Sequence, residues 1–295
     1  MSRAKPFAFV VLASVLFGTT GTAQAILNAD ASGFQVGVAR QIVGGLALLI
    51  IVRFMNQQSI LKYLRTPAGL FAAAGTLLYQ ITFFVGVSNL GVALGTVIAL
   101  GSAPIFTMVM GRVFLKELIT RMQLLVTFLV LVGIWFLVTK PDQSFQINLG
   151  LLAGLGAGLG YAIYTTSSKI MMTQGAQPAT AMTVAFAGPV PIALILFGLS
   201  DPSWILSQAG FATALYLGLI PTALAYIFFG IGLRTLTAST VATITLLEPV
   251  VASAFGVLLL NEVLSSTQAV GIVLVMLGLL ILGIKSSKRK EQVVN

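Results

Sequence analysis

The sequence predicts an all-α integral membrane protein with ten transmembrane helices, arranged as two inverted five-helix repeats. Three observations support this fold class: a strongly apolar composition, ten apolar stretches of spanning length, and a repeat of half the chain length. Of the 295 residues, 58% are hydrophobic and 8% are charged, whereas a soluble domain carries about 25% charged residues. Ten spans of roughly 20 residues consume about 200 residues, which leaves no room for a second, soluble domain.

The apolar stretches are separated by short polar turns or by turns marked with Gly and Pro. Backbone inside hydrocarbon must satisfy its own hydrogen bonds, and these stretches show no strand-like alternation, so we expect helices. The expected spans are 6–27, 34–54, 67–87, 92–115, 123–138, 149–172, 179–199, 211–233, 239–260 and 267–284.

The basic charge follows the expected topology. The formal net charge is +9, and with both termini in the cytoplasm fourteen of the sixteen Lys and Arg residues lie on the cytoplasmic side. Lys140 alone falls on the other side, and Arg40 lies inside a span. This bias obeys the positive-inside rule and requires an even number of spans. Because the charges are divided among short loops, we expect no nucleic-acid partner.

The first 25 residues imitate a cleavable signal peptide. Arg3 and Lys5 precede an apolar run that ends in the small-residue pattern Ala23-Gln24-Ala25. We expect this segment to be retained as the first span, because its removal would leave nine spans and break the even count that the charge bias requires.

The sequence has no histidine and no cysteine. This composition excludes disulfides, thiolate or imidazole metal sites, and catalysis or proton relay by either residue. A His-Glu-x-x-His motif, a serine with a histidine base and a pair of intramembrane aspartates are also missing. We therefore expect no enzyme, no metal and no cofactor, with a membrane-embedded enzyme or a passive channel as the alternative classes.

A shift of 145 residues aligns the chain with itself without a gap. It superimposes Ala103-Pro104 on Glu248-Pro249 and Glu117 on Glu262. The repeat divides the chain into residues 1–147 and 148–295, with five spans each. Because five is odd, the second copy enters the membrane from the opposite side. Inverted repeats of this kind place a site near the midplane of many secondary transporters and expose it alternately to each side, although a duplicated scaffold without transport remains the alternative.

Five segments of the sequence resemble the EamA family of the drug/metabolite transporter superfamily. They are Leu16-Phe17-Gly18-Thr19, Val38-Ala39-Arg40, Ala103-Pro104-Ile105-Phe106 through Phe114-Leu115-Lys116-Glu117, Gly160-Tyr161-Ala162-Ile163-Tyr164, and Leu247-Glu248-Pro249-Val250 through Leu260-Asn261-Glu262. The resemblance covers essentially the whole chain. It implies a ten-helix, inverted-repeat carrier of the inner membrane, often an exporter of amino acids, their derivatives or other small metabolites. Many relatives carry Glu-Pro in both halves, so Ala103 puts a mechanism with two symmetric carboxylates in doubt.

Three charged residues fall within or at the edge of the expected spans. Glu248 is nine residues from the inner end of its span, about 13 Å at helical rise, and thus near the midplane of a core about 30 Å thick. Intramembrane charges are costly and mark functional sites, so a cavity-facing role of Glu248 is weighed against a structural ion pair or a helix-breaking Glu-Pro cap. Arg40 is a second candidate that could equally brace the bundle, and Lys169 is expected to snorkel to the headgroups.

Polar and aromatic side chains near the membrane centre form the remaining candidates for substrate binding. Tyr161, Tyr164 and Thr165 share one helical face by the i, i+3, i+4 rule, although each tyrosine could also be satisfied within the bundle. Pro104 and Pro249 are repeat-related and are the candidates for symmetric bending points. The full set of binding or coupling candidates is Glu248, Arg40, Thr20, Gln24, Tyr79, Gln80, Phe83, Ser102, Tyr161, Tyr164, Thr165 and Tyr226.

These observations predict a secondary transporter of the bacterial-type inner membrane with both termini in the cytoplasm. The expected partners are a small-molecule substrate and the lipid bilayer, with protons as a candidate coupling ion. The sequence leaves a monomer and a homodimer equally open. It also leaves open export of organic cations or drugs instead of amino acids or their derivatives.

Overall fold

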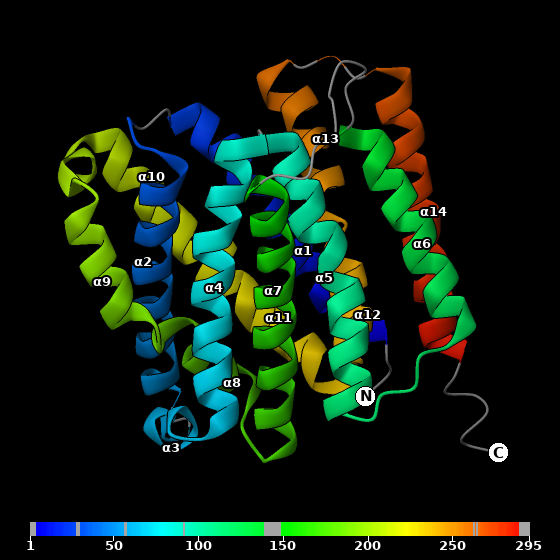
Figure 1. Ribbon diagram of the computed structural model, residues 1–295, viewed down its shortest axis with the longest axis horizontal. Coiled ribbons are helices and arrows are strands. Elements are labelled where there is room, and N and C mark those ends of the chain that lie inside the picture. Colours follow the sequence, from blue (N-terminus) through cyan, green and yellow to red (C-terminus); the bar gives the residue numbers. More distant parts are fainter. Residues whose placement is uncertain are drawn as a thin grey trace.

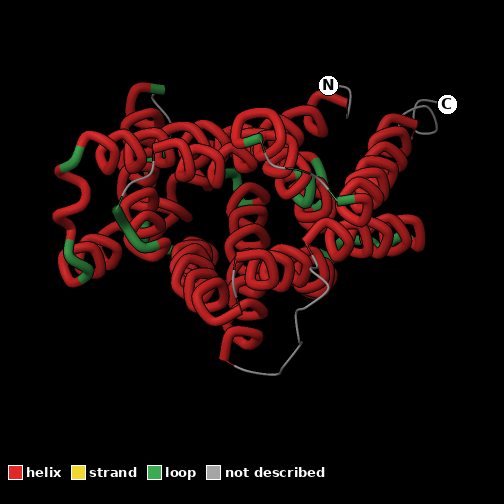
Figure 2. The backbone as a smooth tube through the Cα atoms, turned by 90° about the horizontal axis from the view of Figure 1, so that it is seen from above, coloured by secondary structure: helices red, strands yellow, loops and turns green. Residues whose placement is uncertain are grey.

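The computed structural model describes residues 4–27, 30–55, 58–90, 92–138, 149–261, 263 and 265–288. Every regular element in these ranges is a helix, so the prediction of an all-α protein is confirmed for the described part of the chain. Figure 2 shows the same arrangement, in which the loops of the described residues are short connections between helix ends.

Each expected span of the first half is one continuous helix. The helix α2 begins with a capping box in which Ser32 and Gln35 satisfy each other's backbone N–H groups. A short helix, α3, lies between α2 and α4. The helices of this half are α1 (Ala4–Leu27), α2 (Gly33–Phe54), α3 (Ile60–Leu64), α4 (Pro67–Leu90), α5 (Val92–Phe114) and α6 (Arg121–Val138).

Three of the spans in the second half are broken. A proline lies at each break, because proline has no N–H to continue the helical ladder: Pro189 before α9, Pro221 within a π-helical turn, and Pro249 in the first turn of α13. The elements of this half are α7 (Leu149–Thr173), α8 (Pro178–Ala187), α9 (Val190–Leu199), η1 (Pro202–Leu206), α10 (Gln208–Gly218), η2 (Leu219–Leu224), α11 (Ala225–Thr235), α12 (Ala238–Thr245), α13 (Glu248–Leu260) and α14 (Ser266–Lys288).

Eight helical segments of the described chain are long and apolar enough to cross a membrane. The other two expected spans contain the shorter apolar helices Arg121–Phe136 and Ser266–Leu282, somewhat below the roughly 20 residues of a full span. The chain is therefore a multi-pass membrane protein, and the count of ten spans stays a prediction.

The helices of the two halves pack against one another. The helix α7 lies against α4 and α5, and α1 lies against α11 and α13. The helices α6 and α14 lie side by side at one edge of the bundle, on the right of Figure 1. The start of α1, the end of α14, the helix α3 and the α5–α6 loop are all at the lower end in Figure 1. We call this the basic end, because Arg65, Lys116 and Arg234 lie there.

Glycines on α7 allow its neighbours to approach closely. A Cβ on Gly160 would lie 2.5 Å from the backbone nitrogen of Tyr79 on α4, and one on Gly158 would lie 2.9 Å from the backbone oxygen of Ala99 on α5. Small residues at such contacts let membrane helices pack backbone to backbone. The close contact of α4 and α7 brings Tyr79 next to the tyrosines of α7.

Candidate functional site

The break between α12 and α13 places Glu248 at the start of a half-helix. The N–H groups of Leu246 and Leu247 donate to the carbonyls of Thr243 (3.2 Å) and Ile244 (3.0 Å), which closes α12 in a tight turn. Glu248 then occupies the first turn of α13. The first N–H groups of a helix have no intrahelical partner and carry partial positive charge, so this position favours an anionic group.

Arg40 on α2 contacts the π-helical turn η2. Its Nε donates to the Thr222 hydroxyl oxygen at 3.3 Å, and that hydroxyl donates to the Leu217 carbonyl at 2.8 Å. Leu217 is four residues before Pro221, so the missing proline N–H leaves this carbonyl without its helical donor. The Thr222 hydroxyl replaces that donor and also positions Arg40.

The two intramembrane charges share one electrostatic neighbourhood. Arg40 is the charged group that interacts electrostatically with Glu248, and both charges also act on Tyr79 and Tyr226. Four helices or helix pieces, namely α2, α4, α11 and α13, therefore bring together side chains that lie far apart in the sequence. Lys169 interacts electrostatically with Glu117 instead, so Arg40 is the cation whose charge acts on Glu248.

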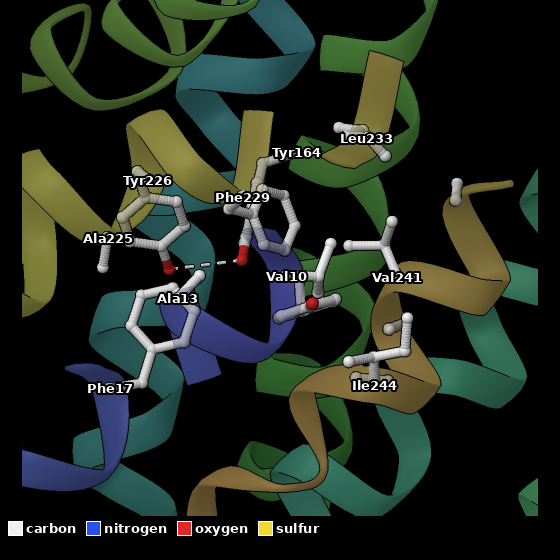
Figure 3. Packing of buried hydrophobic residues seen from close by; sticks show 14 of the residues in the cluster. Val10, Ala13, Phe17, Tyr164, Ala225, Tyr226, Phe229, Leu233, Val241 and Ile244 are labelled. Carbon is white, nitrogen blue, oxygen red and sulfur yellow. Dashed lines mark hydrogen bonds between the residues drawn. The ribbon is translucent and has the colours of Figure 1, made fainter. Parts of the chain in front are cut away.

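Four tyrosines and four phenylalanines form an aromatic cluster that includes Tyr79 and Tyr226. The Tyr164 and Tyr226 hydroxyls are 3.3 Å apart, within hydrogen-bonding distance (Figure 3), and the Tyr161 hydroxyl lies 3.0 Å from the Thr245 hydroxyl, one residue from the helix break. The Tyr161 and Tyr164 rings are 5.0 Å apart at their centroids. The aromatic cluster consists of Phe17, Tyr79, Phe83, Tyr161, Tyr164, Phe186, Tyr226 and Phe229.

The other sequence candidates lie at varying distances from this cluster. Phe83 stacks on Tyr79 with centroids 5.7 Å apart. Thr165 is fully buried, and its hydroxyl has no hydrogen-bond partner. Gln80 is buried against Gly37 of α2.

Three candidates are not joined to the cluster. Ser102 donates to the Ala99 carbonyl at 3.3 Å within its own helix. Thr20 and Gln24 are half-buried on α1, and the hydrogen bonds and ring contacts of the described residues do not connect them to the aromatic cluster.

The two repeat-related prolines differ in their surroundings. Pro104 lies inside α5, which continues unbroken from Val92 to Phe114, whereas Pro249 directly follows the break between α12 and α13. We expected two symmetric bending points, but the helix is interrupted only at Pro249, in the second repeat.

Sequence reasoning missed Thr222, Phe186 and Phe229. Thr222 follows Pro221, and a hydroxyl directly after an intramembrane proline is a signal that could have pointed to the freed carbonyl. Phe229 is the repeat partner of Phe84. Neither aromatic ring stands out from ordinary core residues in the sequence, because its role depends on the neighbours that the fold supplies.

Lys169 and Glu117 bind the turn between α11 and α12 at the basic end. The Lys169 ammonium donates to the carbonyls of Leu233 (2.6 Å) and Arg234 (3.3 Å), and also to that of Leu236. Cations at a helix C-terminus interact favourably with its carbonyls. Lys169 therefore caps α11 rather than extending to the headgroups as expected.

Glu117 caps the next helix. Its Oε1 accepts a hydrogen bond of 2.8 Å from the Ala238 N–H at the start of α12, while its Oε2 is buried without a partner. Burial raises the pKa of this carboxyl above its ordinary value of 4.5, and the Ala238 hydrogen bond and the Lys169 charge offset part of that effect. Together the two side chains fasten the α11–α12 turn to α7 and to the α5–α6 loop.

Comparisons with known proteins identify the family and the fold of this chain. The model of the EamA-like transporter family matches residues 5–139 and 148–284. An uncharacterized transporter of Bacillus subtilis, YwfM, is 38% identical over 282 residues, which cover 96% of this chain and 95% of that protein. The threonine/homoserine exporter RhtA of Escherichia coli is 30% identical over 173 residues, or 57% of each chain.

A solved crystal structure has the same fold. It superimposes with a TM-score of 0.81 over 98% of this chain and all of the other, at 16% sequence identity. The two matches of the family model fit a two-repeat architecture. The chain belongs to the EamA-like transporter family.

Proposed function

We propose that the protein is a secondary transporter that exports small zwitterionic metabolites, such as amino acids or their derivatives, by alternating access. The observation that carries this proposal is the helix break that begins α13 at Glu248, where Arg40 acts on its carboxyl electrostatically and where its charge acts on Tyr79, Tyr161 and Tyr226. A broken helix that presents its N-terminus near the membrane centre is a feature of transporter binding sites.

The chemistry of the site suits a zwitterion. The Arg40 guanidinium can bind a carboxylate through directed hydrogen bonds, and Glu248 can bind an ammonium group. Aromatic faces attract the same cation through their quadrupoles, and Tyr79, Tyr161 and Tyr226 supply such faces. The name of the relative RhtA, a threonine/homoserine exporter, also favours an amino-acid substrate.

The second candidate function is export of organic cations or drugs. The aromatic cluster and Glu248 favour it, because both attract positive charge without requiring a carboxylate on the substrate. Protons are the coupling ion that we propose for either substrate, since Glu248 is a group that can bind and release one.

The proposal places the protein in the inner membrane of a bacterial-type cell with its basic end in the cytoplasm. This orientation puts Arg53, Lys62, Arg65 and every other loop cation except Lys140 inside. The proposal keeps the two five-span repeats, residues 1–147 and 148–295, as the inverted units of the fold.

Counterflow in proteoliposomes tests the proposal. Purified protein is reconstituted with one unlabelled solute inside, and uptake of the labelled solute is followed across a panel of amino acids, organic cations and sugars. Saturable counterflow of an amino acid is the expected result. Non-saturable flux of every solute would indicate a channel, and counterflow of organic cations alone would favour the second candidate.

A further inference from the structure

Two grooves on the bilayer-facing surface are related by the internal repeat. The basic-end groove lies between α4, α5 and α7, and the far-end groove lies between α1, α10 and α13. The 145-residue shift maps the lining residues Phe71, Met110, Phe114 and Ser167 of the first groove onto Tyr216, Phe255, Leu259 and Thr22 of the second. The same helical positions form both grooves, so they are a consequence of the repeat.

The basic-end groove is open to the hydrocarbon and is almost entirely apolar. Its volume is about 580 Å³, against about 360 Å³ for the far-end groove. Phe71 and Phe114 are each 61% exposed at its rim, and Leu159 is 38% exposed. These side chains line a groove whose volume and apolar character suit one hydrocarbon chain.

One polar atom inside this groove has no partner. Thr166 lines the groove, is fully buried, and its hydroxyl makes no hydrogen bond. This hydroxyl has almost no exposed surface, so a molecule in the groove contacts the apolar side chains around Thr166 rather than the hydroxyl itself.

The charges at the two mouths differ. Arg65 lies two residues before the groove residue Pro67, and Lys116 lies two residues after the groove residue Phe114. Both side chains are exposed. At the equivalent positions of the far-end groove the chain has Gly210 and Asn261. The repeat therefore supplies cations at one groove and none at the other.

We propose that the basic-end groove is a binding site for one anionic phospholipid. An acyl chain lies against Phe71, Phe114 and Leu159, and the headgroup phosphate binds Arg65 and Lys116. Basic pockets between transmembrane helices are known to bind anionic headgroups. The far-end groove has the same shape but lacks the cations, so it accepts hydrocarbon without selecting the headgroup.

Native mass spectrometry of the full-length protein tests this site. The protein is mixed with phosphatidylglycerol or phosphatidylcholine, and the retained lipid is counted. We expect one retained phosphatidylglycerol in preference to phosphatidylcholine. The double variant Arg65→Gln, Lys116→Asn should bind phosphatidylglycerol about thirtyfold more weakly, because each cation near an anionic surface contributes a factor of about five. Lys116 has φ 54°, and asparagine tolerates this conformation at the equivalent Asn261.

Matched controls separate the groove from general surface charge. Arg234→Gln removes an exposed cation at the same end without touching the groove, and should leave retention unchanged. Leu159→Trp fills the groove and should abolish retention, whereas Leu152→Trp, two turns away on the same face of α7, should not.

Three results would overturn the proposal. The first is equal retention of phosphatidylcholine, and the second is a loss with Arg234→Gln that matches the loss in the double variant. The third is a pair of results: the wild type shows no lipid preference, and Leu159→Trp loses counterflow. That pair would assign the groove to an amphiphilic substrate. Lipid retention is measured without transport, so its result supports or contradicts the lipid site independently of the proposed function.

Discussion

Glu117 gives a test of the contacts at the basic end that does not depend on knowing the substrate. Its Oε1 caps α12 through a bond of 2.8 Å to the Ala238 N–H. A buried N–H that loses its acceptor costs about 1–3 kcal/mol, and Ala238 is fully buried, so Glu117→Ala should lower the free energy of unfolding by about 2 kcal/mol. Glu117→Gln keeps an oxygen acceptor for Ala238 and removes the charge, and it puts an amide NH2 group in place of the buried, unpartnered Oε2.

The sign of the pH dependence follows from the direction of the pKa shift. The pKa of Glu117 is raised in the folded protein above its ordinary value of 4.5, chiefly by burial. The folded state therefore binds a proton more tightly than the unfolded state, so the stability from this group is fully present below pH 4.5 and is lost as the pH rises through the folded pKa. Glu117→Gln does not titrate, so it should remove this pH dependence.

Thermal unfolding in detergent from pH 4 to pH 7 measures both effects. Asp201→Asn is the control, because the Ser203 hydrogen bonds lower the pKa of that exposed carboxyl. The contribution of Asp201 is present above its unfolded pKa and is lost as the pH falls, the opposite sign to Glu117. If Glu117→Gln kept the pH dependence of the wild type between pH 4 and pH 7, the titration would belong to another group and the reasoning would fail.

Three further predictions concern Arg40, gating and topology. Thr222→Val should cost about 1–2 kcal/mol in thermal unfolding, because it leaves the Leu217 carbonyl and Arg40 without their shared partner, whereas Thr222→Ser should be close to wild type; equal stability of both variants would refute this role. Pro249→Ala should change the accessibility of a cysteine introduced at Phe83, in the aromatic cluster, to a maleimide more than Pro104→Ala does, since only Pro249 lies at a break, and no change in either variant would leave both prolines as packing residues. A cysteine at Ser32 should react with a membrane-impermeant maleimide in intact cells and a cysteine at Lys62 should not, and the reverse pattern would contradict the orientation.

Much of the helical layout could be predicted from composition and spacing. A single span of about 20 apolar residues can satisfy its backbone hydrogen bonds in hydrocarbon only as a helix. The helices α2, α4 and α7 accordingly begin and end within a few residues of the expected bounds. The breaks were harder to predict. Pro104 and Pro249 occupy equivalent positions, yet only the second lies at a helix break, and the neighbours of each proline decide that outcome.

The charged residues of the candidate site are easier to select from the sequence than its polar residues. Glu248 and Arg40 stand out because a charge in a span is costly wherever the helix faces. The rings of the four candidate tyrosines do contact one another, but nothing in the sequence distinguishes them from tyrosines that pack in the core of any helical bundle. The four candidates are Tyr79, Tyr161, Tyr164 and Tyr226.

The contacts of Thr222 depend on a π-helical turn that no periodicity signals. The partners of Lys169 are backbone carbonyls, which carry no mark in the sequence. These parts of the site could only be found from the structure.

The most direct test of the central claim is counterflow with the wild type, Glu248→Gln and Glu117→Gln in parallel proteoliposomes over a range of pH. The central claim is that Glu248, at the start of α13, binds substrate or a coupling proton. Glu248→Gln keeps the shape and hydrogen-bonding capacity of the side chain and abolishes its titration. We predict a folded Glu248→Gln protein with strongly reduced, pH-insensitive counterflow, beside near wild-type counterflow for Glu117→Gln. Wild-type rates with an unchanged pH profile in Glu248→Gln would contradict the account.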